Sequence, residues 1–265
     1  MNQREIEKRM LFAVDLARKA GALSLKYFQK DLLSVEMKNN GTPVSEADKA
    51  AEAFIRESIL KEFPGESIVG EEHGAEGSGD TIWILDPIDG TESFIRGVPL
   101  FGNLIGLEFR GDMKVGVANL PGISETVYAG QGQGTWWMNR DHGPDSPRRA
   151  RVSSTALLSQ AMTCFSSANY FRMADSMPVF DSLMRMTGNS RGWGDCYGHI
   201  LVATGRADAA VDPYMEVWDS AALLPIVVEA GGRFTDFSGM PDIRGRNAIS
   251  SNGKIHDEYL ALVRA

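Results

Sequence analysis

Two aspartates three residues apart give the clearest chemical signal in the chain. Asp86 and Asp89 follow an apolar run over 82–85, which reads as a buried strand that ends at Asp86. Gly90 and Thr91 come next and open a predicted helix. Paired carboxylates bind hard cations such as Mg²⁺, and the free N–H groups of a helix N-terminus bind anions. The spacing therefore predicts a site for a metal ion and a phosphate.

Two further acidic segments could supply ligands to the same site. Glu71 and Glu72 stand between glycines, directly after an apolar pair, and Asp219 lies at the start of a mostly apolar helix. Each segment also has an ordinary structural interpretation. Asp86 and Asp89 could be turn residues, the adjacent glutamates a solvated surface, and Asp219 a helix N-cap. Because the acidic segments occur together, we favour the metal site.

Hydrophobic periodicity and turn residues predict the elements of the first half. A helix is expected over 3–29 and a second one from Ser45 until Pro64-Gly65 stops it, with Ser45 and Asp48 in a capping-box pattern. Residues 36–44 read as a turn or mobile loop and 74–80 as a glycine-rich connection. Strands are expected at 67–70 and 82–85, and an antiparallel meander at 100–109, 113–119, 124–130 and 134–138.

Beyond a polar, proline-containing stretch at 139–149, helices and strands alternate. Strands are expected at 161–165, 208–212 and 233–236, and helices at 176–187, 195–205, 217–231 and 254–264. Such alternation favours an α/β layer. We therefore expect two parts: an α+β part over 1–145 with the Glu71 and Asp86–Thr91 motifs, and an α/β part over 146–265 with Asp219.

Composition excludes several classes of function. The 265 residues carry a net charge of −8, which disfavours a nucleic-acid partner because phosphate backbones are bound by clustered Lys and Arg. Two cysteines and four scattered histidines match no zinc pattern, and we expect Cys164 and Cys196 to be free thiols in a reducing compartment. The charged N-terminal segment does not match a signal peptide, and no apolar run is long enough to span a membrane. We expect a cytoplasmic protein.

Three motifs, in order, resemble the inositol monophosphatase superfamily. They are Gly-Glu-Glu at 70–72, Trp-Ile-Leu-Asp-Pro-Ile-Asp-Gly-Thr-x-Ser-Phe at 83–94, and Trp-Asp-x-Ala-Ala at 218–222 with Glu-Ala-Gly-Gly downstream. The resemblance runs from about residue 10 to residue 260. It implies an α+β or α/β protein with the layered αβαβα sugar-phosphatase fold. It also implies a Mg²⁺-dependent, lithium-sensitive phosphomonoesterase, with Mn²⁺ as an alternative ion, that usually forms homodimers.

Finer features resemble the histidinol-phosphate phosphatases of that superfamily. Ser93 stands where inositol monophosphatases usually carry Asn, Arg96 lies near the position of their usual His, and Asp212 stands where the inositol branch tends to place Glu. The segment 191–197 also resembles the histidinol branch. This implies hydrolysis of histidinol phosphate to histidinol and phosphate, a step of histidine biosynthesis. The alternatives are an inositol-1-phosphate or broad sugar-phosphate phosphatase and, more remotely, a non-catalytic protein that binds metal and phosphate.

The resemblance also implies a role for each motif residue. Glu71, Asp86 and the Ile88 carbonyl would bind a first Mg²⁺, and Asp86, Asp89 and Asp219 a second. Thr91 and Glu71 would orient and deprotonate the attacking water, and the Gly90 and Thr91 amides would hold phosphate oxygens. Asp48 would lie near a weaker third metal, and Lys38 in a loop over the site. Substrate beyond the phosphate would meet Glu92, Arg191, Asp195 and Asp212.

The chemistry expected of such a site follows from charge. Two Mg²⁺ ions offset four carboxylates, so that a dianionic phosphate meets a nearly neutral site. Attack by water needs no Cys or His nucleophile, and we expect no covalent phosphoenzyme. The ammonium group of histidinol phosphate could pair with Asp195 and Asp212. Both residues also have a structural interpretation: Asp195 as a helix cap and Asp212 as the end of a strand.

Overall fold

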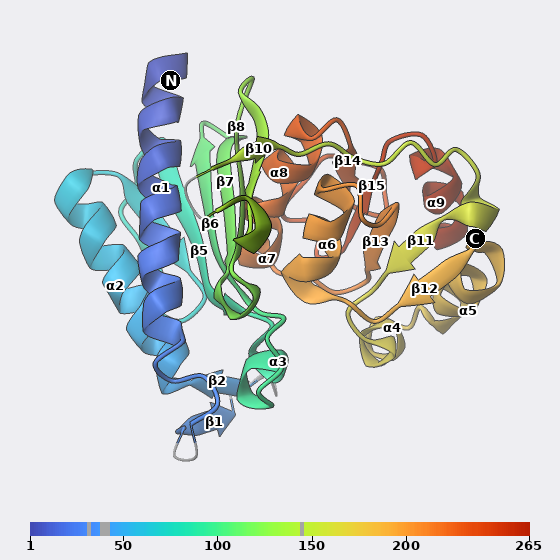
Figure 1. Ribbon diagram of the computed structural model, residues 1–265, viewed down its shortest axis with the longest axis horizontal. Coiled ribbons are helices and arrows are strands. Elements are labelled where there is room, and N and C mark those ends of the chain that lie inside the picture. The colour runs from blue at the N-terminus through green and yellow to red at the C-terminus, as the bar shows by residue number, and fades with distance from the viewer. Residues whose placement is uncertain (31–32, 38–42, 144–145) are drawn as a thin grey trace.

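Helical layers and two β-sheets alternate through the computed structural model, which describes residues 1–30, 33–37, 43–143 and 146–265 (Figure 1). Helices α1 (Gln3–Ser24) and α2 (Glu46–Glu62) cover one face of an eight-stranded sheet. Helices α6 (Asp195–Ala203), α7 (Val217–Ala221) and α8 (Leu223–Glu229) lie between that sheet and a five-stranded one. The outer layer contains α4 (Ala168–Met173), α5 (Met177–Met186) and α9 (His256–Val263). This is the αβαβα layering that we expected.

The first sheet has the strand order β10-β9-β8-β7-β6-β5-β3-β4. Its strands are β3 (Ser67–Gly70), β4 (Gly74–Glu76), β5 (Thr81–Asp89), β6 (Gly102–Phe109), β7 (Asp112–Leu120), β8 (Glu125–Gly130), β9 (Gly134–Met138) and β10 (Arg148–Arg149). All neighbours are antiparallel except β3 and β5. The predicted meander is therefore confirmed as β6 to β9. The parallel pair places the ends of β3 and β5, with their acidic motifs, at the same edge of the sheet.

The second sheet has the order β12-β11-β13-β15-β14. Its strands are β11 (Met162–Cys164), β12 (Asn189–Arg191), β13 (Ala209–Asp212), β14 (Arg233–Thr235) and β15 (Ala248–Ser251). Smaller elements are the pair β1 (Val35–Met37) and β2 (Pro43–Ser45), the helix α3 (Thr91–Ile95), and short 3₁₀ turns at Pro121–Ile123, Arg140–His142 and Leu158–Gln160.

Both long N-terminal helices begin where the sequence predicts. Asn2 and Glu5 form a capping box on α1, and Ser45 and Asp48 form one on α2, so that free N–H groups of each first turn are satisfied. Helix α1 ends at Ser24, before the predicted end at residue 29. In the predicted 36–44 loop, residues 36–37 belong to strand β1 and residues 43–44 to strand β2, while 38–42 lie outside the described residues. The predicted 74–80 connection contains strand β4.

Strand β5 differs from the prediction because it does not end at Asp86-Pro87. It continues to Asp89, and the register against β6 shifts between Asp86 and Asp89. A proline is tolerated at such an irregularity because no ladder hydrogen bond needs its missing N–H. The Pro87 carbonyl accepts a hydrogen bond from the Asn103 side chain at 2.6 Å. Both aspartates therefore belong to a rigid strand rather than to a turn.

One predicted helix is divided in two. We expected a continuous helix over 217–231, but α7 ends at Ala221 and α8 begins at Leu223. Pro225 lacks the N–H that would bond to the Ala221 carbonyl four residues earlier, and this explains the break. Close packing holds α8 on the sheet, because a Cβ on Gly116 of β7 would lie 2.1 Å from the Ala222 carbonyl oxygen.

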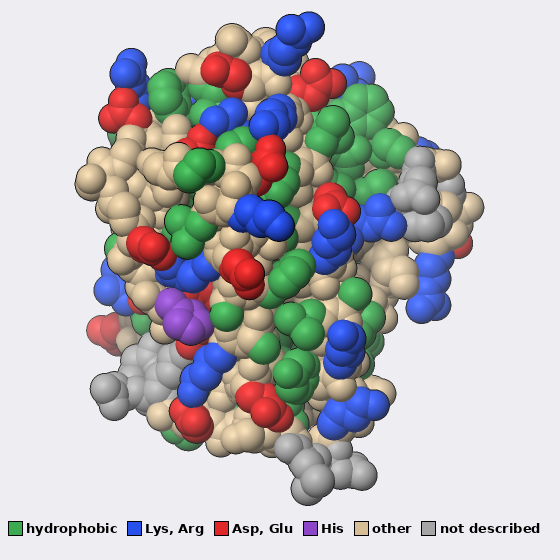
Figure 2. Space-filling model, turned by 90° about the vertical axis from the view of Figure 1, so that its left-hand side faces the viewer, with side chains coloured by type: hydrophobic (Ala, Val, Ile, Leu, Met, Phe, Trp, Pro, Cys, Tyr) green, Lys and Arg blue, Asp and Glu red, His purple; other side chains and the backbone are tan. Residues whose placement is uncertain are grey.

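The face formed by α1 and α2 carries Lys, Arg, Asp and Glu side chains interspersed among apolar ones (Figure 2). Mixed charges of this kind do not form the continuous basic surface that a nucleic-acid backbone requires. Within the described ranges, no helix combines the length and the apolarity needed to cross a bilayer.

Candidate metal and phosphate site

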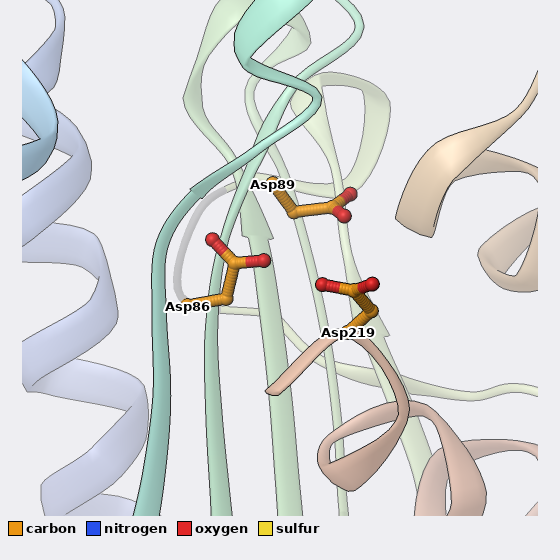
Figure 3. A group of neighbouring side chains, drawn as sticks. All are labelled: Asp86, Asp89 and Asp219. Atoms are coloured by element: carbon orange, nitrogen blue, oxygen red, sulfur yellow. The ribbon is translucent and has the colours of Figure 1, made fainter. Parts of the chain in front are cut away.

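Three carboxylates from distant parts of the chain converge at the end of β5 (Figure 3). Asp86 and Asp89 belong to β5 and Asp219 to α7, and one oxygen from each lies within 4.8 Å of the others. Glu71 follows β3 directly, and its backbone N–H bonds to the Leu85 carbonyl of β5. The expected convergence of Asp86, Asp89 and Asp219 is confirmed.

Crowding of these acids makes their charged forms costly without a counter-ion. Burial, followed by the charges of Glu71 and Asp89, raises the pKa of Asp86 well above its usual value. Burial, followed by the Asp195 charge, does the same to the pKa of Asp89. Burial also raises the pKa of Asp219 to about 7. A divalent cation would reverse this effect, because it attracts all the carboxylates that otherwise repel one another.

The donor set fits a hard cation. Asp86 Oδ1 is buried and has no hydrogen-bond partner among the described residues. Such an orphaned oxygen is costly unless something binds it. The side-chain atoms that the triad offers to a metal are all carboxylate oxygens, which suit Mg²⁺, Ca²⁺ or Mn²⁺ rather than softer metals.

Two of the predicted metal ligands are held in place by backbone hydrogen bonds. Asp219 is the third residue of α7, not its N-cap, and it accepts a hydrogen bond from the Glu216 backbone N–H at 2.7 Å. Asp89 Oδ2 accepts one from the Cys196 N–H, at the start of α6, at 2.6 Å. Each bond leaves other lone pairs of the carboxylate for a metal. The interpretation of Asp219 as the N-cap is therefore wrong. Glu216 is the N-cap of α7, and Asp219 is the third helical residue of its capping box.

The turn after Asp89 brings a hydroxyl and free amides to the site. Gly90 has a φ of 79°, a left-handed conformation that suits glycine, and it is the N-cap of α3. Thr91 Oγ1 lies 3.1 Å from the Ile88 carbonyl and 3.3 Å from Asp48 Oδ1. The other Asp48 oxygen accepts hydrogen bonds from the Ser45 N–H and hydroxyl, while burial raises the Asp48 pKa.

A pocket opens over the triad and is strongly acidic. It is lined by eight carboxylate residues: Glu71, Asp86, Asp89, Glu92, Asp195, Asp212, Glu216 and Asp219. No Lys, Arg or His stands among the lining residues within the described part of the chain. Four of the eight acids exceed what the predicted metal ligands require. Of these four, Glu92 and Glu216 pair with Arg96 and Arg246, which leaves Asp195 and Asp212. The pocket therefore suits a metal-bound phosphate whose remaining part is cationic.

Two of these additional acids, Asp195 and Asp212, lie at the edge of the second sheet and its adjoining helix. Asp212 ends β13, and its two oxygens accept from the Ser166 N–H at 2.7 Å and contact His199 Nε2 at 3.1 Å. Asp195 is the first residue of α6, after the N-cap Gly194, and has a left-handed φ of 52°. Burial, followed by the Asp212 charge, raises the pKa of Asp195 to about 6. A strained residue in a pocket is typical of a functional position.

Other predicted site residues differ in position. Glu92 lines the pocket but is exposed and paired with Arg96. Arg191 does not line it: its guanidinium is exposed and bonds to the Asn189 side chain and the Ser190 carbonyl. Lys38 lies outside the described residues. Sequence reasoning gave no role to several lining residues. Ser166, Tyr170, Tyr214 and Glu216 stand in no motif, and Trp218 stands in the Trp-Asp-x-Ala-Ala motif but was not predicted as a site residue.

Comparisons with known proteins agree with this geometry. The sequence model of the inositol monophosphatase family matches residues 5–265. A histidinol-phosphatase of Chlorobaculum parvum is 44% identical over 95% of both chains, and one of Streptomyces coelicolor is 38% identical over 92% of both. Among solved structures, an IMPase of Thermotoga maritima is 34% identical over 97% of both chains, with a TM-score of 0.84.

Proposed function

Because this chain belongs to the inositol monophosphatase family, we propose that it is a Mg²⁺-dependent phosphomonoesterase that hydrolyses histidinol phosphate to histidinol and phosphate. The observation that carries the proposal is the acidic pocket, in which Asp195 and Asp212 remain after the predicted metal ligands and the arginine-paired Glu92 and Glu216 are counted. The similarity to histidinol-phosphatases over nearly the whole chain supports the same substrate.

Charge explains why this substrate fits. Two Mg²⁺ ions held by Glu71, Asp86, the Ile88 carbonyl, Asp89 and Asp219 would activate a water and stabilise the leaving alkoxide. The ammonium group of histidinol phosphate lies close to its ester oxygen. Asp195 and Asp212 line the same pocket as the triad, so they can pair with that ammonium group while the phosphate lies at the metal site. A neutral polyol phosphate would leave both carboxylates without a cation.

The residues around the phosphate have separate tasks in this proposal. The Gly90 and Thr91 amides, at the start of α3, bind phosphate oxygens. Thr91 and Glu71 orient the attacking water, and Glu71 accepts its proton. Asp48, fixed by its two bonds to Ser45, holds the Thr91 hydroxyl in place.

The second candidate is an inositol-1-phosphate or broad sugar-phosphate phosphatase. Its support is the structural similarity to the Thermotoga maritima IMPase. A non-catalytic role is disfavoured, because the acidic triad and the Thr91–Asp48 contact are all in place.

Phosphate release with Mg²⁺ tests the proposal. Purified protein is assayed with histidinol phosphate and inositol-1-phosphate, and we expect the higher kcat/KM on histidinol phosphate. Asp212→Asn should lower kcat/KM on histidinol phosphate about tenfold more than on inositol-1-phosphate, as expected for loss of a charge-assisted contact. Asp181→Asn, on the exposed face of α5, is the matched control for loss of one negative charge.

Two outcomes would count against the proposal. Equal losses of kcat/KM on the two substrates would contradict the assignment of Asp212 to the ammonium group. A lack of Mg²⁺-dependent release from both substrates would favour the non-catalytic alternative. Five properties stay predictions of the family resemblance: a homodimer, a cytoplasmic location, lithium inhibition, Mn²⁺ substitution and the substrate contact of Arg191.

A further inference from the structure

Two tyrosines form an aromatic wall in the acidic pocket. Tyr170 belongs to α4 and Tyr214 to the segment between β13 and α7, and both line the pocket. Their ring centroids are 6.0 Å apart and the ring planes are tilted by 44°. Among the described residues, neither ring belongs to a hydrophobic core cluster. Core packing therefore does not account for the pair.

Neighbouring groups fix Tyr214 in place. Its hydroxyl donates to Glu216 Oε1 at 3.0 Å, and the Arg246 guanidinium lies over its ring at 5.5 Å from the centroid. Arg246 also bonds to Glu216 at 2.6 Å. The ring is therefore positioned before any substrate arrives, which reduces the entropy lost on binding.

Charge around Tyr170 has a different character. Burial, followed by the charges of Asp195, Asp219 and Asp89, raises the pKa of Tyr170. Tyr170 lines the same pocket as the predicted metal ligands Asp89 and Asp219 and the predicted ammonium partner Asp195. Its ring thus stands close to the region that the organic part of the substrate must occupy.

We propose that Tyr170 and Tyr214 form a subsite for a planar heteroaromatic ring carried by the substrate, next to the carboxylates that pair with its ammonium group. This inference rests on the proposed function and deepens it, because histidinol phosphate carries an imidazole beyond its amine. Aromatic pairs favour offset or edge-to-face contacts at 4.5–7 Å, and a protonated imidazole adds a cation–π attraction. Since an unperturbed imidazole titrates near pH 6.5, both forms are available at neutral pH.

A pair of substrates isolates the ring from the amine and the phosphate. The protein is assayed with histidinol phosphate and with 2-aminopropyl phosphate, which has the same ester and ammonium group but no ring. The quantity of interest is the ratio of kcat/KM for the two substrates. Tyr170→Leu and Tyr214→Leu should each lower this ratio about tenfold, while Tyr170→Phe, which keeps the ring, should leave it within about twofold of the parent.

The substrate without the ring also controls for folding and for the metal site. Tyr214 contacts Glu216, which caps the helix of Asp219, so a disturbance of that helix would lower both rates together. If the parent prefers histidinol phosphate and both leucine variants lose the two activities in equal proportion, the subsite is refuted and the proposed function stands. If the parent itself shows no preference for the ring-bearing substrate, the subsite is refuted as well. If the parent releases no phosphate from histidinol phosphate at all, the proposed function is refuted without any variant, and the subsite that rests on it is refuted too.

Discussion

The buried imidazole of His199 contacts the carboxylate of Asp212, with Nε2 3.1 Å from Oδ2, while its Nδ1 lies 2.6 Å from the Ser250 hydroxyl. His199 is fully buried, so it reaches no substrate itself. An ionised Asp212 can only accept a hydrogen bond, which assigns the proton to Nε2 and lets Nδ1 accept from Ser250. The histidine thereby holds Asp212 in the orientation that the pocket uses.

Replacement of His199 should therefore affect one substrate class more than the other. His199→Phe keeps an aromatic ring but removes the bond to Asp212, at a cost of about 1.5–3 kcal/mol in stability for a hydrogen bond to a charged group. We expect kcat/KM on histidinol phosphate to fall more than on inositol-1-phosphate. Ser250→Ala is the control. It removes only the bond at Nδ1 of His199, away from Asp212, and should change the ratio of kcat/KM for the two substrates little. An unchanged ratio in His199→Phe would show that Asp212 does not depend on this contact.

A second buried acid supports the segment that carries Glu71. Glu52 in α2 is fully buried and accepts hydrogen bonds from the backbone N–H groups of Glu72 and His73, at 2.7 and 3.1 Å, and from Arg56 at 2.7 Å. A Cβ on Gly70 would lie 2.2 Å from the Glu52 carboxylate, so this close approach depends on the glycine.

Glu52→Gln should weaken metal binding, although Glu52 is not itself a predicted metal ligand. The amide offers one acceptor oxygen where the carboxylate offers two, and it removes the nearer of the two acidic partners of Arg56, Glu52 and Glu76, at a cost of about 1–3 kcal/mol. Titration with Mg²⁺, followed by thermal unfolding, should show a lower melting temperature and a weaker Mg²⁺-induced shift. Glu57→Gln, on the exposed side of the same helix, should match the parent. Retention of the full Mg²⁺-induced shift in Glu52→Gln would rule out this supporting role.

Asp86→Asn should change stability and metal binding in opposite directions. Without metal, the buried Asp86 carboxylate faces the charges of Glu71, Asp89 and Asp219, and neutralising it removes that repulsion. We expect the metal-free variant to gain about 1–2 kcal/mol, which corresponds to a rise of roughly 2–8 °C in melting temperature for a chain of this size. Mg²⁺ should no longer raise its melting temperature, and activity should be lost.

Asp80→Asn is the control for Asp86→Asn, because Asp80 is exposed and pairs with Arg110 at the surface. Calorimetry in chelator and in Mg²⁺ measures both variants. A lower melting temperature of Asp86→Asn in chelator would contradict the repulsion that we infer.

His256 should make the folded state sensitive to acid. Burial, followed by the Arg233 charge, lowers its pKa from 6.5 to about 4, and its ring bonds to Thr235 and Ser251. Below pH 6.5 the His256 imidazole binds a proton in the unfolded chain, whereas in the folded state it stays unprotonated until the pH approaches 4. This contribution to stability is therefore complete above pH 6.5 and is lost as the pH falls towards 4, by on the order of 3 kcal/mol. Urea unfolding of the parent and of His256→Gln at pH 7.5 and 4.5 should show a smaller pH dependence in the variant. Equal pH dependence would exclude His256 as its source.

The sequence predicted most strongly what local motifs specify. The capping box of α2, the meander and the acidic triad were all marked by short patterns of residue types, whereas the Asn2–Glu5 capping box of α1 was not predicted. The prediction that the strand ends at Asp86-Pro87 was wrong. Pairing of β5 with β6 is a tertiary contact, and it overrides the turn propensity of Asp-Pro. Helix α4 was missed because six residues are too few for a helical period to be visible. Strand β15 was not predicted either, although strands β13 and β14, which are no longer than β15, were.

The rest of the pocket was not predictable from one sequence. Tyr170 and Tyr214 come from different elements and meet only after the second sheet and its helices are assembled. The role of His199 depends in the same way on Asp212 and Ser250, which lie on neighbouring strands β13 and β15. No spacing along the chain marks either set.

The bond between Asp89 and the Cys196 N–H joins a strand of the first sheet to a helix that packs against the second. A cation shared by Asp86, Asp89 and Asp219 would add a further cross-link between the same two halves of the polypeptide. Ion binding and the docking of the halves are then thermodynamically linked. An intermediate with only one half folded lacks either Asp219 or the pair Asp86 and Asp89, so it should bind the shared ion more weakly than the native state does. Saturation with the ion should therefore make unfolding more cooperative.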